Sequence, residues 1–130
     1  MQRLSLLLCS ALLAACSSSV EMHRLSGEVF YLQRSALPPQ ATLEISLLDV
    51  SLADAPAQVL ARQAGPVAGQ VPLPFSLAYD PTQLQPGHRY AVSARIEADG
   101  RLLFITTEQH GVALDGSDPQ PLRICVDAVR

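Results

Sequence analysis

The Asp99-Gly100 dipeptide constrains the fold of this chain more than any other feature, because alternating segments flank it on both sides. The whole segment is YAVSARIEADGRLLFITTE, residues 90–108. Asp-Gly favours a two-residue type I′ turn, in which both central residues take positive φ angles. Such a turn predicts a hairpin whose core faces match without a register slip. The predicted cross-strand pairs are Ala98 with Arg101, Ile96 with Leu103, and Ala94 with Ile105.

In this register, Arg95 and Glu97 share the face away from the core with Leu102 and Phe104. An exposed apolar pair on an otherwise charged face is a typical mark of a protein contact. We therefore predict a partner-binding surface at Leu102 and Phe104. The alternative is that the second sheet or a loop covers both side chains.

Period-two alternation continues through the rest of the chain after residue 24. ATLEISLLDV (41–50) alternates three apolar residues with polar ones, and VPLPFSLAY (71–79) places five apolar or aromatic residues on one face. Pro72 and Pro74 cannot donate ladder hydrogen bonds, so the start of that strand is predicted to lie at a sheet edge. Further candidate strands are Ser26–Leu32, Gln58–Gln63 and Leu122–Val126.

About seven short strands, separated by segments rich in proline, glycine and aspartate, predict an all-β fold, an antiparallel β-sandwich. Pro81–Leu84 is predicted to form at most one helical turn. The 130 residues fit one domain, and 48% hydrophobic against 16% charged residues suffice for a core. The net charge is -3, the basic residues are scattered arginines and Trp is absent, which argues against binding to nucleic acid.

The N-terminus has the features of a targeting segment. Arg3 precedes an apolar stretch and the small residues Ala14 and Ala15, so residues 1–15 are predicted to be a secretory signal peptide, too short to span a membrane. The ending LAAC resembles the bacterial lipobox, which implies that Cys16 is lipidated and becomes the mature N-terminus. The alternative is an ordinary secretory signal with an incidental cysteine.

Lipidation would divide the chain into three parts. Residues 16–23, with three serines, would form the lipidated N-terminus and its tether, and residues 24–130 the β-sandwich domain. The acyl chains on Cys16 would hold the protein on a membrane, because more than one chain gives stable anchoring. The residue after Cys16 is not aspartate, and resemblance to enterobacterial sorting signals then implies the periplasmic side of the outer membrane.

The polar segment DVSLADAP invites two interpretations. Asp49, Ser51 and Asp54 bring acceptors close together, as a catalytic or cation site would, but such residues more often form polar turns. Asp80 before Pro81 is predicted to cap the helical turn. We expect no metal site, because His23, His88 and His110 lack ligand spacing. No nucleophile elbow or paired carboxylates stand out, and we expect neither an enzyme nor a cofactor.

Cys125 would be the remaining thiol of the mature chain. Strict alternation in LRICVDAV places it on the face opposite the core, with Arg123 and Asp127. The interpretation we favour is a mildly buried, unreactive thiol. The alternative is an intermolecular disulfide in an oxidising periplasm.

The domain resembles a known family. SGEV (26–29), DVSLADAP (49–56) and PLPFSLAYDPTQLQPGHRYAVSARI (72–96) are similar to the YbaY/YscW family of bacterial lipoproteins, over essentially the whole mature domain. The resemblance implies a β-sandwich lipoprotein of the envelope, and some members are pilotins that bind a secretin subunit. We therefore expect a non-enzymatic binding or chaperone module. The alternative is an envelope-integrity or stress lipoprotein that binds a small molecule or a glycan.

Overall fold

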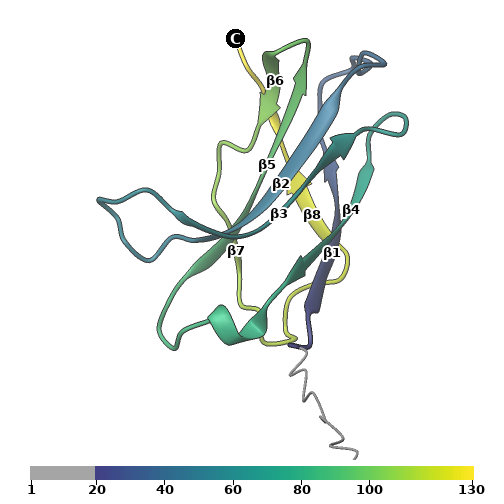
Figure 1. The fold of residues 1–130 in the computed structure, drawn as a ribbon. Helices are drawn as coiled ribbons and strands as arrows, with labels where there is room; N and C mark the ends of the chain where they lie inside the picture. The colour runs from purple at the N-terminus through teal and green to yellow at the C-terminus, as the bar shows by residue number, and fades with distance from the viewer. Residues whose placement is uncertain (1–19) are drawn as a thin grey trace, which may run out of the picture.

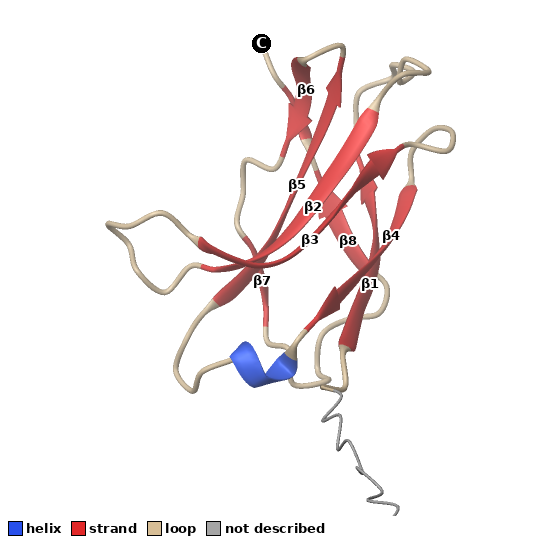
Figure 2. Cartoon of the chain, in the orientation of Figure 1, coloured by secondary structure: helices blue, strands red, loops and turns tan. Residues whose placement is uncertain are grey.

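The computed structural model describes residues 20–130, which form two packed β-sheets and one short 3-10 turn (Figures 1 and 2). The predicted all-β sandwich is confirmed. The 3-10 turn η1 spans Pro81–Gln83, where one helical turn was expected. The strands are β1 (His23–Phe30), β2 (Thr42–Asp49), β3 (Gln58–Pro66), β4 (Leu73–Tyr79), β5 (Tyr90–Ala98), β6 (Arg101–Ile105), β7 (His110–Val112), β8 (Leu122–Cys125) and β9 (Asp127–Ala128).

The two sheets differ in size. The smaller has the order β4-β1-β8, and the larger has the order β3-β2-β5-β6-β9, with β7 also paired to β5. All pairs are antiparallel except β1 with β8, which is parallel. The seven expected strands are present. The short strands β7 and β9 were not predicted.

The Asp99-Gly100 turn forms as predicted, with φ angles of 52° and 75°. The predicted register is confirmed next to the turn and is wrong from Leu103 onward. Ala98 pairs with Arg101 and Glu97 with Leu102, as that register requires, but Ile96 pairs with Phe104 and not with Leu103, so Leu103 is an extra residue in a β-bulge. A bulge reverses the alternation of the strand that carries it.

The core lies between the two sheets and follows the predicted alternation. Four of the five expected residues of VPLPFSLAY are buried, from Leu73 to Tyr79, and Val71 is half-buried. Ile45 and Leu47 are at most 1% exposed, and Leu43 packs against the cluster. The side chains that are almost fully buried are Ile45, Leu47, Leu77, Ile96, Leu122, Ile124, Val29, Val92 and Val126.

Gly27 brings three strands close together at the centre of the smaller sheet. It pairs with Phe75 of β4 on one side and with Leu122 of β8 on the other. A Cβ atom here would lie 2.5 Å from the Leu122 carbonyl oxygen and 2.8 Å from the Phe75 ring. The glycine of SGEV is therefore required for close packing of neighbouring strands.

The sandwich has one closed side and one open side. At the closed side the chain crosses directly from β8 to β9, where the Val126 N–H donates to the Phe30 carbonyl. At the open side, β4 is an edge strand, as its prolines predicted, and faces the edge of β3. The Gln63 side chain accepts a hydrogen bond from the Ser76 N–H there, across 3.1 Å. Beside it lies a cavity of about 190 Å³ with an apolar lining that includes Leu43, Leu73 and Val67.

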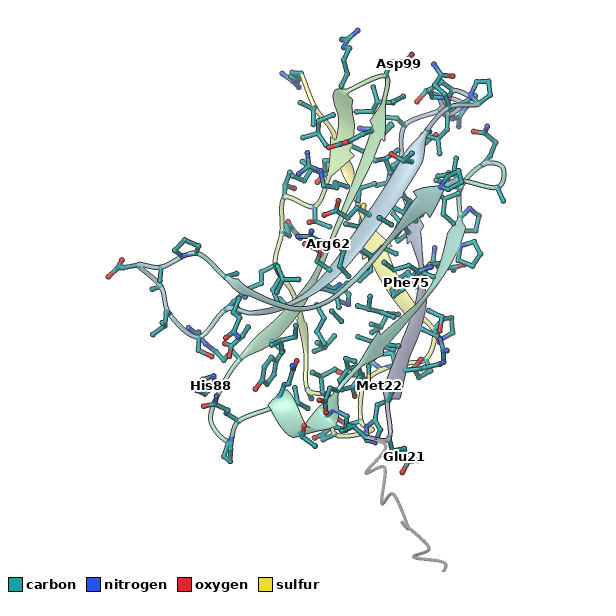
Figure 3. All side chains as sticks on the ribbon, viewed as in Figure 1. Glu21, Met22, Arg62, Phe75, His88 and Asp99 are labelled. Carbon is teal, nitrogen blue, oxygen red and sulfur yellow. The ribbon has the colours of Figure 1, made fainter. Side chains whose placement is uncertain are left out.

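The two ends of the sandwich differ in what they carry. Figure 3 shows Glu21 and Met22 at one end, where β1 begins, and Asp99 at the opposite end. η1 and the loop with His88 lie toward the end with Glu21 (Figures 1 and 3). Among residues 20–130, no helix has the length and apolar character needed to cross a membrane.

Candidate functional site

The face of the larger sheet that points away from the core has a hollow of about 310 Å³. It lies over β2, β3, β5 and β6, and we call it the outer-sheet hollow. A second bulge shapes it, because Leu47 pairs with Ala61 and Leu48 with Val59, which leaves Leu60 extra in β3. Bulges increase the local twist and bend of a strand. Residues lining the hollow include Ser46, Leu48, Val59, Arg62, Arg95 and Ile105.

The rim of the hollow is charged. Arg62 Nε lies 3.4 Å from a Glu44 carboxylate oxygen, and Arg95 pairs with Glu97 through Nη2. Both ion pairs are partly exposed, so they contribute little to stability. Figure 3 places Arg62 on β3 near the middle of the larger sheet. Apolar groups framed by compensated charges are suited to contact another protein.

The bulge at Leu103 decides which apolar residues reach this face. Phe104 was expected on it but is 7% exposed and stacks on Tyr31 in the core, with ring centroids 4.1 Å apart. The expectation of an outward-facing Phe104 is therefore wrong. Leu102 is half-buried and pairs with Glu97, as an outer-face residue would, and Ile105 takes the place that Phe104 was expected to fill. The partner role of Leu102 stays a prediction.

Two polar groups lie on the floor of the hollow. Ser46 is 6% exposed and is the buried polar residue of the described core strands. Arg95 Nε is buried and has no acceptor among residues 20–130. Buried polar groups are almost always hydrogen-bonded, so each such exception calls for a specific explanation.

The DVSLADAP segment forms a polar clasp with the loop before β5. One Asp49 oxygen accepts from the Ser51 N–H and hydroxyl, at 3.0 and 2.5 Å, and the other lies 2.6 Å from His88 Nδ1. The Ser51 hydroxyl oxygen accepts from the Arg89 N–H at 2.8 Å, and the Val50 N–H donates to the Arg89 carbonyl. The turn interpretation of Asp49 and Ser51 is thus supported. The turn also connects the loop after β2 to the loop before β5 through hydrogen bonds.

The clasp contains serine, aspartate and histidine, but not in the order of a catalytic triad. Asp49 stands between the other two, so the histidine does not contact the serine hydroxyl and cannot accept its proton. Hydrogen bonds from His88 and Ser51 lower the pKa of Asp49 to about 2. A carboxylate held in the ionised form by its neighbours orients those neighbours, and this arrangement is structural.

The remaining polar candidates have local roles. Asp80 caps η1, accepting from the Thr82 N–H at 2.9 Å, as predicted. Asp54 is exposed in the loop between β2 and β3, which projects from the sandwich in Figure 1. His23 lies edge-on to Tyr79, and His110 is in β7. Within the part of the chain described, no group of three histidine, cysteine or acidic side chains is placed to hold a metal.

Cys125 lies on the outward face of β8, as the alternation predicted. It is exposed and free, so the expected mild burial is wrong. Partial desolvation, followed by the charges of Asp127 and Glu108, raises the pKa of its thiol. Cys16 and the predicted signal peptide lie outside the described residues, and the lipidation of Cys16 stays a prediction.

Comparisons with known proteins identify the family of this chain. The family described as "Type III secretion system lipoprotein chaperone (YscW)" matches residues 20–124. The "Uncharacterized lipoprotein YbaY" of Escherichia coli (strain K12) is 38% identical over 107 residues, which are 82% of this chain and 56% of that protein. The chain thus spans little more than half the length of this curated relative.

A solved structure is also similar, "Structure of an alternative pilotin from the type II secretion system of Vibrio cholerae". It is 45% identical, with a TM-score of 0.79, and the match covers 85% of this chain and 99% of that chain. The family resemblance carried by SGEV, DVSLADAP and YDP is confirmed. The chain belongs to the YscW family of type III secretion system lipoprotein chaperones.

Proposed function

We propose that this protein is a lipoprotein held by Cys16 on the periplasmic side of the outer membrane, where its sandwich binds an envelope protein without catalysing a reaction. The observation that carries this proposal is the match to the Vibrio cholerae pilotin, at 45% identity over 99% of that chain. A secretin subunit is the partner we propose, by analogy with pilotins.

The outer-sheet hollow is the surface we assign to this partner. It combines half-buried apolar side chains at Leu48 and Ile105 with two arginines on its rim. Leu102 extends the apolar surface along β6. The buried centre of a protein interface is apolar, and arginine is enriched among the interface residues that contribute most to affinity.

The alternative of a small-molecule or glycan lipoprotein has one supporting feature, the cavity between β3 and β4. Its volume of about 190 Å³ exceeds that of a cavity that holds benzene, about 150 Å³. The apolar lining favours a small apolar group over a glycan, because sugar hydroxyls need polar partners. The glycan form of the alternative therefore does not fit this cavity.

The anchor and the partner are tested by separate experiments. Cys16→Ser should move the protein from the detergent phase to the aqueous phase in detergent phase separation, or leave it unprocessed. If the variant still fractionates like the parent, the lipoprotein proposal is wrong.

For the partner, the tagged protein is recovered from detergent-solubilised envelope, and its co-purifying proteins are identified. Ile105→Glu, in the hollow, should abolish recovery of a secretin subunit. Leu32→Glu makes the same chemical change at a side chain that is 80% exposed after β1, and should leave recovery unchanged. Thermal melting of both variants checks that they are folded. Recovery of no envelope protein above background by the parent would count against the proposed function.

A further inference from the structure

The cavity between β3 and β4 has a buried floor and an exposed rim. Ile45 and Leu73 line it and are 1% and 3% exposed. Ala64, Pro66 and Pro74 also line it and are exposed, so the cavity opens to the solvent. Because most of the lining is apolar, an apolar occupant that displaces water from it is favoured.

Hydrogen bonds hold the end wall of this cavity in place. Val67 and Ala68 form the wall, at the start of the loop that joins β3 to β4. The Val67 N–H donates to the Ala41 carbonyl at 3.1 Å. Gln70, in the same loop, accepts from the Leu37 N–H at 2.6 Å and donates to the Leu37 carbonyl at 3.1 Å. A wall held in this way resists collapse, and the cavity is therefore preformed, as binding sites usually are.

Gly65 lines the same cavity, and no close packing within the fold requires a glycine there. A Cβ atom on Gly65 would meet nothing within 4 Å, and its φ angle lies outside the left-handed region. Gly27 is the opposite case, because a Cβ atom there would lie 2.5 Å from the Leu122 carbonyl oxygen. A glycine weakens a strand, and it often marks a place where a ligand or another backbone approaches closely.

The backbone beside the cavity offers hydrogen bonds at the open edge of β3. Because the Val67 N–H points to β2, the alternation along the strand directs the Ala64 N–H and carbonyl away from β2. Pro66 has no N–H on one side, and Gln63 bridges to Ser76 on the other. The open edge beside the cavity therefore includes one donor and one acceptor at Ala64, which is exposed. A residue of an extended peptide supplies the matching acceptor and donor.

We propose that this cavity receives one large apolar side chain, a phenylalanine or a leucine, from an extended segment of another protein. One residue of that segment pairs with Ala64. Its neighbour, opposite Gly65, faces the cavity, because opposite residues of two paired strands share a face. The cavity of about 190 Å³ is larger than one of about 150 Å³ that holds benzene, so a phenyl ring fits. Gly65 leaves the space open for this ring.

This site is separate from the outer-sheet hollow and goes beyond the proposed function. The hollow lies on the face of the larger sheet that points away from the core, whereas the cavity lies between the edges of the two sheets. A free hydrocarbon would fill the cavity but leave the donor and the acceptor of Ala64 unused. The combination of an apolar cavity with a free strand edge therefore favours a peptide segment.

The test uses the peptide acetyl-Thr-Lys-Thr-Phe-Thr-Lys-Thr-amide, titrated into the isotope-labelled full chain in phospholipid nanodiscs and followed by NMR. Nanodiscs replace detergent, because detergent would compete for the cavity. We expect saturable shifts of the Ile45 and Leu73 methyl signals and of the Ala64 amide signal. The same peptide with alanine in place of phenylalanine should bind about tenfold more weakly, since less apolar area is buried. Absence of saturable shifts, or equal binding of the two peptides, overturns the inference.

Variants of Gly65 and one matched control complete the test. Gly65→Val places two methyl groups beyond the Cβ atom in the cavity and should abolish the shifts, and Gly65→Ala should weaken binding. Gly111→Ala adds the same methyl group to a glycine of β7, where it would lie 3.9 Å from the Tyr90 carbonyl oxygen, and should leave binding unchanged. Thermal melting checks that all three variants are folded. Unchanged binding in Gly65→Val, or equal losses in Gly65→Ala and Gly111→Ala, overturns the inference.

Other occupants of the cavity give different outcomes. Toluene that shifts the Ile45 and Leu73 signals when neither peptide does would assign the cavity to a free apolar molecule. Shifts of the same signals as the concentration of the parent rises, absent from Gly65→Val, would assign it to a second copy of the chain. Either result overturns the inference. None of these readouts requires recovery of a secretin subunit, so this inference and the proposed function can fail separately.

Discussion

His88 Nδ1 lies 2.6 Å from Asp49 Oδ2, and this contact joins the last residue of β2 to the loop before β5, 39 residues away. The same carboxylate holds the Ser51 N–H and hydroxyl. The side chain of Asp49 is only 12% exposed. The DVSLADAP and QPGHRY segments, which lie far apart in the sequence, therefore depend on one another for their conformation.

This clasp predicts a pH dependence of stability. The pKa of Asp49 is lowered to about 2 in the folded protein, against an ordinary value near 3.8. A carboxyl group whose pKa is lowered by folding stabilises the protein above the unfolded pKa, and this contribution disappears as the pH falls toward the folded pKa. Between about pH 4 and pH 2, the melting temperature of the parent should therefore fall more steeply than that of Asp49→Asn.

The matched control is Asp54→Asn, which removes an exposed carboxylate from the loop that follows Asp49. Thermal melts followed by circular dichroism at half-unit intervals of pH measure the three profiles. Asp54→Asn should keep the steep profile of the parent. Identical profiles for Asp49→Asn and the parent would contradict the role given to the clasp.

Gly27 and Gly65 predict opposite responses to the same substitution. A Cβ atom on Gly27 would overlap the Leu122 backbone and the Phe75 ring, so Gly27→Ala should destabilise the protein by about 1–3 kcal/mol, as overpacking does. A Cβ atom on Gly65 would meet nothing within 4 Å, and Gly65 lines the cavity between β3 and β4. Gly65→Ala should be stabilising by about 0.4–1 kcal/mol, because it restricts the unfolded chain. Urea denaturation of the two variants measures both free energies of unfolding.

The bulge in β6 predicts unequal costs for two neighbouring truncations. Phe104 is 7% exposed and stacks on Tyr31, so Phe104→Ala should cost about 3–5 kcal/mol. Leu102 is half-buried on the other face, and Leu102→Ala should cost no more than about 1.5 kcal/mol. The unbulged register would give the reverse order. Chemical denaturation of both variants therefore tests the register directly.

In the β5–β6 hairpin, part of the structure could be predicted from the sequence and part could not. The Asp99-Gly100 turn and the buried faces of β2 and β4 follow from local chemistry, since positive φ angles and period-two alternation have clear residue signatures. The bulge at Leu103 does not follow from local chemistry. Residues 102–105 are all apolar, so either face of β6 could enter the core. The packing of Phe104 against Tyr31 determines which face is buried.

The candidate site was predictable only in part. Leu102 was placed on the correct face, but the outer-sheet hollow also depends on the extra residue Leu60 in β3, whose segment QVLARQ carries no turn signal. Ser46 and Arg95 belong to strands 49 residues apart in sequence, and only the register of β2 on β5 brings them near one another. The pairing of such distant residues is a tertiary property.

Cys125 provides the last prediction. Its thiol is exposed, so it should react with a disulfide reagent in the folded protein, which a buried thiol would not. Desolvation and the charges of Asp127 and Glu108 raise its pKa, so the thiolate fraction at neutral pH is small and the reaction should be slow, with a rate that increases as the pH rises toward the raised pKa. Asp127→Asn should increase the rate at pH 8, since it removes the larger of the two charge effects.

The rate is measured as the difference between each protein and its Cys125→Ser counterpart, which cancels any other thiol. Asp54→Asn, in the loop between β2 and β3, is the control and should react at the parental rate. A rate for Asp127→Asn equal to or below that of the control would contradict the electrostatic cause, and a thiol that reacts only after unfolding would contradict its exposure.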